Sequence, residues 1–348
     1  MTHIYDDKSV PTIDCKPEVS QNPSSISYQT NLLVPGEGPE LHPVSASISN
    51  TRIQKIPPLR LALCGGGMRC IAHVGVFKAL AQHNCLTCVK EVLGISAGAL
   101  FSLLFVLEYT IPEIERLALE FDFNLLQNID PDSFFNFPLT FGLDSGAGLE
   151  KFISTVLIHK GFKPEVTFED LQAKKKIRLR CFAADIQQQK VKEFSSEKTP
   201  TFTVKTALRA SMSLPILYQP INDPTTGRML MDGGVLHNLP LVFQKEYEIP
   251  ETLAILFTKT AKASCESKPE LFEIFQQVYD SITLMRNKPY LEKYKENVLC
   301  IEVNGFDSIS FAETREKRAE LIESAKQQTE KFLFTPSVKK PVRRFSCH

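Results

Sequence analysis

The chain has 348 residues, and its 40 Lys and Arg balance its 40 Asp and Glu, so the formal net charge is zero. An apolar fraction of 43% supplies a large core and excludes global disorder. The neutral balance argues against a nucleic-acid-binding protein, which needs a clustered basic excess to neutralise phosphates. The longest apolar run, residues 97–107, is too short for a membrane span, which needs about 20 residues. We therefore expect a soluble or peripheral protein.

The two ends of the chain differ in composition from its middle. Residues 1–57 are rich in Ser, Pro, Asn and Thr, so we predict a disordered leader there, without a Sec-type signal peptide. Residues 58–335 are predicted to form one catalytic domain, and residues 336–348 a basic flexible tail. The nine cysteines are odd in number and lie mostly in apolar runs, which is typical of free thiols in a reducing compartment.

From Leu59 onwards, apolar strands alternate with glycine turns and helices. A strand at 59–64 precedes three glycines and a helix at 71–83. A second strand at 89–93 precedes a Gly-x-Ser-x-Gly turn and a helix at 97–109. This repeated order is typical of parallel sheets. The predicted fold class is therefore α/β, a three-layer sandwich with a central, mostly parallel sheet.

The same pattern continues along the chain. Thr110 to Glu113 forms a capping box, which predicts a helix through Phe121, and Ser310 to Glu313 is a second such box before the last helix. Residues 122–148 resemble a loop. The remaining predicted helices are 149–158, 168–174, 203–212, 270–286 and 312–333, and the remaining strands are 177–184, 190–194, 229–231, 252–258 and 298–303.

Phenylalanines are concentrated between residues 121 and 141, more densely than an exposed loop normally carries them. Two interpretations are open: they belong to the core and an acyl pocket, or they form a lid that meets a membrane. The first is favoured. The six residues are Phe121, Phe123, Phe134, Phe135, Phe137 and Phe141.

The most informative turn is Gly-Ile-Ser-Ala-Gly at 94–98, which lies between a predicted strand and a predicted helix. This is the context of a nucleophile elbow, in which a sharp turn presents a serine hydroxyl above the sheet. The following helix N-terminus offers amide groups to a developing negative charge. Ser96 is therefore the candidate nucleophile.

A second glycine turn, Gly-Gly-Gly-Met-Arg at 65–69, also joins a strand to a helix. Its spacing fits neither a Walker A loop nor a dinucleotide-binding fingerprint. Unobstructed amide groups suit a phosphate cradle or an oxyanion hole, and an ordinary tight turn is the alternative. Its position about 30 residues before an elbow serine favours the oxyanion hole.

The base that would activate Ser96 has few candidates. The histidines that follow it are His159, His237 and the terminal His348, and none comes with an obvious acidic partner in triad order. Asp232 ends a short apolar strand and precedes two glycines, so its carboxylate could act on a serine hydroxyl directly. An ordinary Asp-Gly-Gly turn is the alternative interpretation.

Taken together, these motifs resemble those of the patatin-like phospholipases over about residues 59–245. The matching segments, in family order, are 65–69, 94–98, 210–215 (Ala-Ser-Met-Ser-Leu-Pro) and 232–234 (Asp-Gly-Gly). The resemblance implies a patatin-like fold and a Ser–Asp dyad without histidine that hydrolyses acyl esters of lipids. On this basis Ser96 is the nucleophile and Asp232 the base.

The resemblance also assigns roles to the first glycine loop. It implies an oxyanion hole built from backbone amides of Gly65, Gly66, Gly67 and Met68. Arg69 occupies the family's basic position, where it orders the loop or holds a lipid phosphate; a structural ion pair is the alternative. Cys70 departs from the family's usual glycine, and we expect it to take a helical conformation because a positive φ is costly for cysteine.

The function implied is a lipid acyl hydrolase of phospholipase A or lysophospholipase type, acting through an acyl-serine intermediate. We expect no metal and no cofactor, a cytoplasmic or peripheral-membrane location, transient contact with a membrane surface, and a protein activator as a further candidate partner. Two alternatives stay open: a catalytically silent lipid-binding regulatory protein, and a serine esterase with a Ser-His-Asp triad. The leader and tail are also compatible with a bacterial effector delivered into a host cell without a Sec signal.

Overall fold

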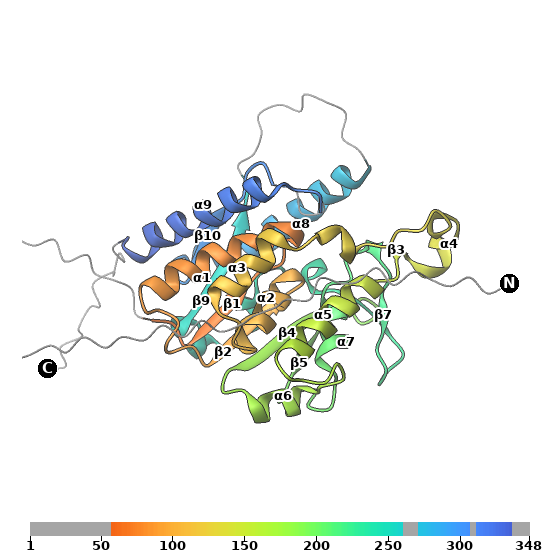
Figure 1. Ribbon diagram of the computed structural model, residues 1–348, viewed down its shortest axis with the longest axis horizontal. Coiled ribbons are helices and arrows are strands. Elements are labelled where there is room, and N and C mark those ends of the chain that lie inside the picture. The colour runs from red at the N-terminus through yellow and green to blue at the C-terminus, as the bar shows by residue number, and fades with distance from the viewer. Residues whose placement is uncertain (1–56, 260–270, 307–310, 336–348) are drawn as a thin grey trace, which may run out of the picture. The chain divides into compact units, whose positions relative to one another are not determined.

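The apolar runs of the sequence form an eight-stranded mixed sheet in the order β10-β9-β1-β2-β4-β8-β7, with β5 paired to β4 (Figure 1). The computed structural model describes residues 57–259, 271–306 and 311–335. The predicted tail, and all of the predicted leader except its last residue, lie outside the described residues. Five strands are parallel: β1 Arg60–Leu63, β2 Glu91–Ile95, β4 Arg178–Asp185, β9 Thr252–Thr258 and β10 Val298–Glu302. Three are antiparallel to their neighbours: β5 Lys190–Ser195, β7 Ile221–Asn222 and β8 Met229–Asp232.

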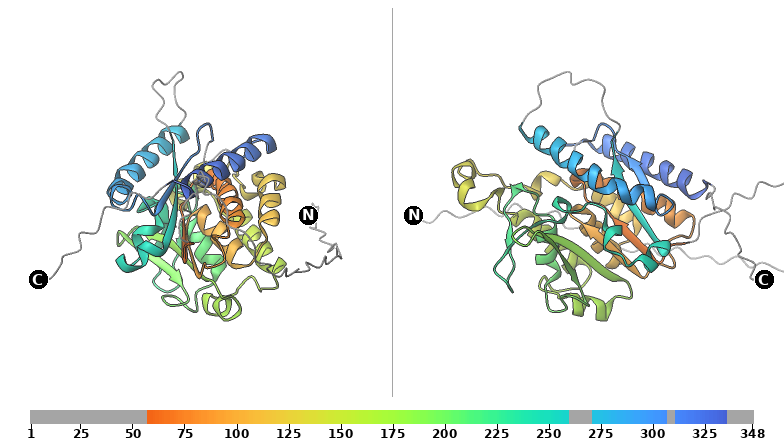
Figure 2. Two further views of the ribbon diagram at one scale, coloured as in Figure 1. Left: turned by 90° about the vertical axis from the view of Figure 1, so that its left-hand side faces the viewer. Right: turned by 180° about the vertical axis from the view of Figure 1, so that it is seen from behind.

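Both faces of this sheet are covered, but unequally. Side chains alternate along each strand, so each strand contributes to both faces. Leu61 and Leu63 of β1 join a large apolar cluster, whereas Ala62 joins a smaller one on the opposite face. The larger cluster is covered by α1 Ala72–Gln82, α2 Ala97–Val106, α3 Ile111–Glu120, α5 Ala147–His159, α6 Phe168–Lys174, α7 Val204–Ser211 and α9 Arg315–Leu333. The smaller is covered by the 3₁₀ turns η4 Pro240–Phe243 and η5 Glu246–Glu251 and by the end of α8 Leu271–Lys293. Figure 2 shows α8 and α1 on opposite sides of the sheet, so the predicted three-layer α/β class is confirmed.

Several predicted elements need correction. Residues 122–148 are not a loop throughout: they contain the 3₁₀ helix η2 Phe123–Leu126, the helix α4 Ser133–Thr140 and β3 Gly142–Asp144, which pairs with β6 Ile216–Tyr218. The predicted strand 89–93 lies at Glu91–Ile95, where it pairs with β4, and Arg178 and Arg180 of β4 form ion pairs with the buried carboxylate of Glu91. The predicted helix 270–286 continues to Lys293.

The two capping boxes predicted from the sequence have different outcomes. The Thr110 capping box is present as predicted, with Glu113 as its partner, and it starts α3. Ser310 of the second predicted box lies outside the described residues, and α9 is capped by Thr314 instead, whose side chain accepts the Lys317 amide. Among the described residues, no helix is long and apolar enough to cross a bilayer.

Candidate active site

Two strands that are far apart in the sequence end side by side along β4. β5 pairs with one edge of β4 along Arg180–Asp185, so β2 and β8 both occupy the opposite edge. β2 runs parallel to β4 and ends with Ile95 opposite Phe182. β8 runs antiparallel and ends with Asp232 opposite Ala183, the next residue along. The sheet register therefore brings Ser96, which follows β2, next to Asp232.

Ser96 occupies a strained turn between β2 and α2. Its φ of 53° and ψ of −135° are unusual for a residue other than glycine, and it is half-buried. A Cβ on Gly98 would lie 2.4 Å from the Cys64 carbonyl, so only glycine lets α2 approach β1 this closely. Ser211 fixes the turn, because its Oγ accepts the Ser96 amide at 3.0 Å and donates to the Phe182 carbonyl at 2.7 Å.

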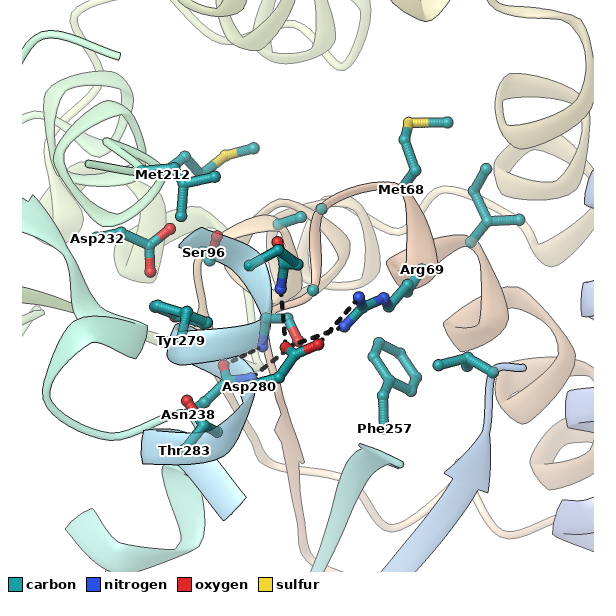
Figure 3. A pocket seen from close by; sticks show the side chains of 18 of the residues that line it. Met68, Arg69, Ser96, Met212, Asp232, Asn238, Phe257, Tyr279, Asp280 and Thr283 are labelled. Carbon is teal, nitrogen blue, oxygen red and sulfur yellow. Dashed lines mark hydrogen bonds and ion pairs between the residues drawn. The ribbon is translucent and has the colours of Figure 1, made fainter. Parts of the chain in front are cut away.

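Asp232 is fully buried and faces Ser96 (Figure 3). Its Oδ1 accepts the Gly234 amide at 2.8 Å, while Oδ2 has no hydrogen-bond partner of good geometry among the described residues. Burial raises the pKa of this carboxyl to about 7, against the lowering effects of the nearby Ser96 hydroxyl and the Gly234 amide. A carboxyl with a pKa near 7 can accept and release a proton at neutral pH.

The first glycine loop lies against Ser96, but its four predicted donors are not equivalent. The Gly65 amide donates to Asn238 Oδ1 at 2.8 Å, so the prediction of Gly65 as an oxyanion donor needs correction. Asn238 Nδ2 returns a hydrogen bond to the Gly65 carbonyl at 3.2 Å, which fixes the loop. A Cβ on Gly65 would lie 2.7 Å from the Ser96 Cβ. Gly65 therefore lets the loop approach Ser96 closely, while its amide donates its hydrogen bond to Asn238.

The amides that follow Gly65 are better placed to receive a negative charge. Gly67 and Met68 are the first residues of the 3₁₀ helix η1 Gly67–Ile71, where amide groups have no acceptor within the helix. Together with Gly66 they line the same cavity as Ser96. Cys70 is buried within η1 without a positive φ, so its predicted helical conformation is confirmed.

Arg69 does not reach into the cavity as a free cation. Its guanidinium forms a bidentate pair with Asp280 of α8, with both nitrogen–oxygen distances at 3.2 Å (Figure 3). Its Nε donates to the Phe306 carbonyl at 3.3 Å. The arginine side chain is 7% exposed, and that of Asp280 is 35% exposed. Of the interpretations left open by the sequence, the geometry matches the ion pair that orders the loop.

A mainly apolar cavity of about 280 Å³ opens beside Ser96 and Asp232. Its walls come from the glycine loop, α2, η2, the segment after α7, β9 and α8. None of the described residues that line it is a histidine. The apolar lining includes Phe101, Phe123, Leu126, Leu149, Met212, Leu217 and Phe257.

Of the three histidines considered from the sequence, His159 and His237 lie elsewhere, and His348 is outside the described residues. His237 lines a different cavity beside Arg286, and burial together with that cation lowers its pKa. His159 ends α5, where its Nδ1 lies 3.1 Å from the Tyr109 hydroxyl. Neither lines the cavity that contains Ser96. The described residues also contain no group of three His, Cys, Asp or Glu side chains suited to hold a metal ion.

Four residues at the site were not predicted from the sequence: Tyr279 and Asp280 of α8, Ser211 and Asn238. A Cβ on Gly234 would lie 1.9 Å from the Tyr279 hydroxyl, so that phenol lies directly over the Asp-Gly-Gly turn. Burial raises the pKa of Tyr279 well above its usual value, so its hydroxyl is neutral. Ser211 lies within the motif segment 210–215 and Asn238 lies shortly after the segment 232–234, but no local signal distinguishes the two α8 residues.

The comparisons with known proteins include one match to a family model, which covers more than half of the chain. A family model described as Patatin-like phospholipase matches residues 61–242. A Bacillus subtilis (strain 168) protein named Uncharacterized protein YqhO is 29% identical over 290 residues, which cover 77% of this chain and 96% of that protein. Probable lipid hydrolase 463L of Invertebrate iridescent virus 6 is 28% identical over 187 residues, 54% of this chain and 63% of that protein. The crystal structure of VipD from Legionella pneumophila has a similar fold, with a TM-score of 0.55 and 17% identity, and the match covers 80% of this chain and 67% of that one.

Proposed function

Because the chain belongs to the patatin-like phospholipase family, we propose that it hydrolyses acyl esters of phospholipids or lysophospholipids with Ser96 as nucleophile and Asp232 as general base. One observation carries the proposal. The sheet register places a buried carboxyl with a pKa of about 7 beside an elbow serine, at the wall of an apolar cavity. A carboxyl with that pKa suits proton transfer near neutral pH.

In the proposed mechanism, Asp232 Oδ2 accepts the proton of the Ser96 hydroxyl as its Oγ attacks the ester carbonyl carbon. The negative charge on the carbonyl oxygen is stabilised by the amides of Gly66, Gly67 and Met68. The proton then passes to the departing alcohol oxygen, and the acyl group stays on Ser96. Water, deprotonated by the same carboxylate, attacks this ester, and the fatty acid leaves as the proton returns to the serine.

The surrounding residues support a lipid substrate rather than a small polar ester. An apolar cavity wall next to the nucleophile suits an acyl chain, whose burial is driven by the hydrophobic effect. Arg69 is assigned to holding the glycine loop, because Asp280 and the Phe306 carbonyl already occupy its guanidinium. The structure therefore favours selection by the acyl chain over selection by a headgroup phosphate bound at Arg69.

Substitution of the two proposed dyad residues tests the mechanism. Ser96→Ala and Asp232→Asn should each lower kcat on phospholipid vesicles by about 10³-fold or more, because residues that act as a unit fail together. His237→Ala is the matched control and should keep nearly full activity, since His237 lines another cavity. Loss of activity in His237→Ala with retention in Asp232→Asn would replace the dyad with a triad.

A covalent probe separates an active hydrolase from a silent lipid-binding protein. A fluorophosphonate should label wild-type protein at Ser96, identified by peptide mass spectrometry, and should leave Ser96→Ala unlabelled. Wild-type protein that binds lipid but takes no label under folded conditions would support the regulatory alternative. Product analysis from mixed phospholipid vesicles would then identify the acyl position and headgroup cleaved.

A further inference from the structure

Exposed apolar side chains are unevenly distributed over the described residues. Thirteen large ones are exposed, of which six lie between residues 125 and 141 and five between residues 274 and 285. The remaining two, Ile158 and Tyr247, are isolated on other elements. Scattered apolar residues need no explanation, but a concentration of this kind marks an interaction surface. The eleven residues are Leu125, Ile129, Phe134, Phe135, Leu139, Phe141, Ile274, Val278, Ile282, Leu284 and Met285.

The first group centres on α4, which buries none of its own residues. Phe134 is 63% exposed, Phe135 85% and Leu139 80%. The eight residues of α4 include no charged side chain. Figures 1 and 2 show this helix at the margin of the fold, next to β3. For Phe134, Phe135 and Phe141, the favoured prediction of a core or pocket position is therefore wrong.

The second group lies on the outer face of α8. This helix has its apolar side chains outward and polar side chains inward, the reverse of a usual amphipathic helix. Ile274, Val278, Ile282 and Met285 recur at spacings of three or four residues, so they share one face, and they are exposed. The face toward the cavity carries polar side chains instead: Gln276 and Asn287 are buried, and Asp280 pairs with Arg69. A helix with its apolar face outward lacks the burial that normally stabilises an amphipathic helix.

Each group has a member at or next to the wall of the cavity that contains Ser96. Phe123 and Leu126, next to exposed Leu125, line that cavity, and Leu284 of α8 is both exposed and part of its wall. Between residues 281 and 290, α8 carries no acidic residue and two exposed cations, Lys288 and Arg286, the second of which also donates to the Leu236 carbonyl. Cations beside an apolar surface complement the phosphate groups of a lipid interface.

We propose that α4 and the outer face of α8 dock this protein onto a phospholipid bilayer and so place the cavity against its substrate. The proposal rests on the lipid-hydrolase function proposed above. The exposed phenylalanines of α4 enter the region between headgroups and acyl chains, and the apolar face of α8 lies on the same interface. Docking buries the apolar side chains that the fold leaves exposed on α4 and α8.

Vesicle binding tests this surface separately from catalysis. Full-length protein carrying Ser96→Ala, which leaves the lipid intact, is mixed with phosphatidylcholine–phosphatidylserine vesicles, and the bound fraction is measured by flotation. Two double variants are compared in this background: Phe134→Ser with Phe135→Ser on α4, and Ile282→Ser with Met285→Ser on α8. Ile158→Ser with Tyr247→Ser removes two exposed apolar residues from other elements and is the matched control.

Each of the two surface variants should bind vesicles about tenfold more weakly or worse, and the control should bind like its parent. With Ser96 restored, the surface variants should cleave a short soluble ester within about twofold of wild type, because none of the four substituted residues lines the cavity. Equal vesicle binding by all variants would overturn the docking proposal, as would a change from oligomer to monomer in the surface variants, which would identify an interface between copies. Vesicle binding by a wild-type protein that cleaves no ester would instead refute the proposed hydrolase function and leave the docking surface standing.

Discussion

At the scale of single residues, the chemistry depends on how Asp232 is buried. The carboxyl is fully buried, and its charged form is stabilised by the neutral Ser96 hydroxyl and the Gly234 amide rather than by a cation. Burial disfavours the charged form, so the pKa is raised to about 7. A salt-bridged aspartate would have a low pKa and would be a weak base. No cation among the described residues pairs with Asp232, so its carboxyl can exchange a proton near neutral pH.

This pKa predicts the pH dependence of the reaction. The base works only when ionised, so kcat/KM on a soluble ester should be constant above pH about 8 and fall as pH decreases through about 7. At pH 6 about a tenth of the protein would be active, and the decrease should approach tenfold per pH unit. Circular dichroism at each pH controls for unfolding. An inflection near pH 4 would mean that burial does not raise the pKa of the Asp232 carboxyl above its ordinary value.

At the scale of elements, α8 is the least conventionally packed helix around the site. It places Tyr279 over the Asp-Gly-Gly turn and contributes much of the cavity wall, yet several of its inward-facing residues are polar. Its attachment to the glycine loop depends on the pair between Asp280 and the nearly buried Arg69. Because Asp280 is partly exposed, solvent screens this pair and limits its energy.

Asp280→Ala should therefore loosen α8 without unfolding the protein. We expect a loss of about 1–2 kcal/mol in the free energy of unfolding, since the substitution leaves a largely buried guanidinium without its carboxylate. Hydrogen exchange should become faster across residues 271–293. Lys293→Ala is the matched control, because Lys293 lies on the same helix and its exposed pair with Glu246 of η5 should contribute little. Unchanged exchange in Asp280→Ala would show that α8 is held by other contacts.

At the scale of the whole molecule, the described fold extends beyond the residues matched by the family model. That model ends at residue 242, but β9 lies next to β1 in the sheet, and α9 packs along α1. The close approach of the two helices depends on Gly75, where a Cβ would lie 2.0 Å from the Ile322 carbonyl of α9. The C-terminal elements are therefore part of the same core as the glycine loop.

Gly75→Ala tests this packing. The substitution has two effects on stability, and they have opposite signs. Helix propensity alone would stabilise α1 by about 1 kcal/mol, whereas forcing α9 away from α1 should cost about 1–3 kcal/mol. We expect the second effect to dominate and Tm to fall, since the obstructing atoms belong to the backbone of α9. A higher Tm would contradict the described spacing of the two helices.

The sequence by itself determined the features that depend on neighbouring residues. Apolar runs between glycine turns located β1, β2 and the helices that follow them, and Thr110 marked the start of α3. Glycine flanks identified the Ser96 turn, because only small residues allow a strand and a helix to meet so sharply. These signals depend only on neighbouring residues, so they can be interpreted without knowledge of the fold.

Only the tertiary structure decided what each residue does with its neighbours. Asn238 engages the Gly65 amide from 173 positions away, which removes one predicted oxyanion donor. The pairing of β2 and β8 along one edge of β4 brings Ser96 to Asp232, and burial there sets the carboxyl pKa. The outward apolar faces of α4 and α8 likewise follow from packing. Hydrogen bonding, burial and exposure depend on contacts between distant segments, and a pattern of adjacent residues does not contain them.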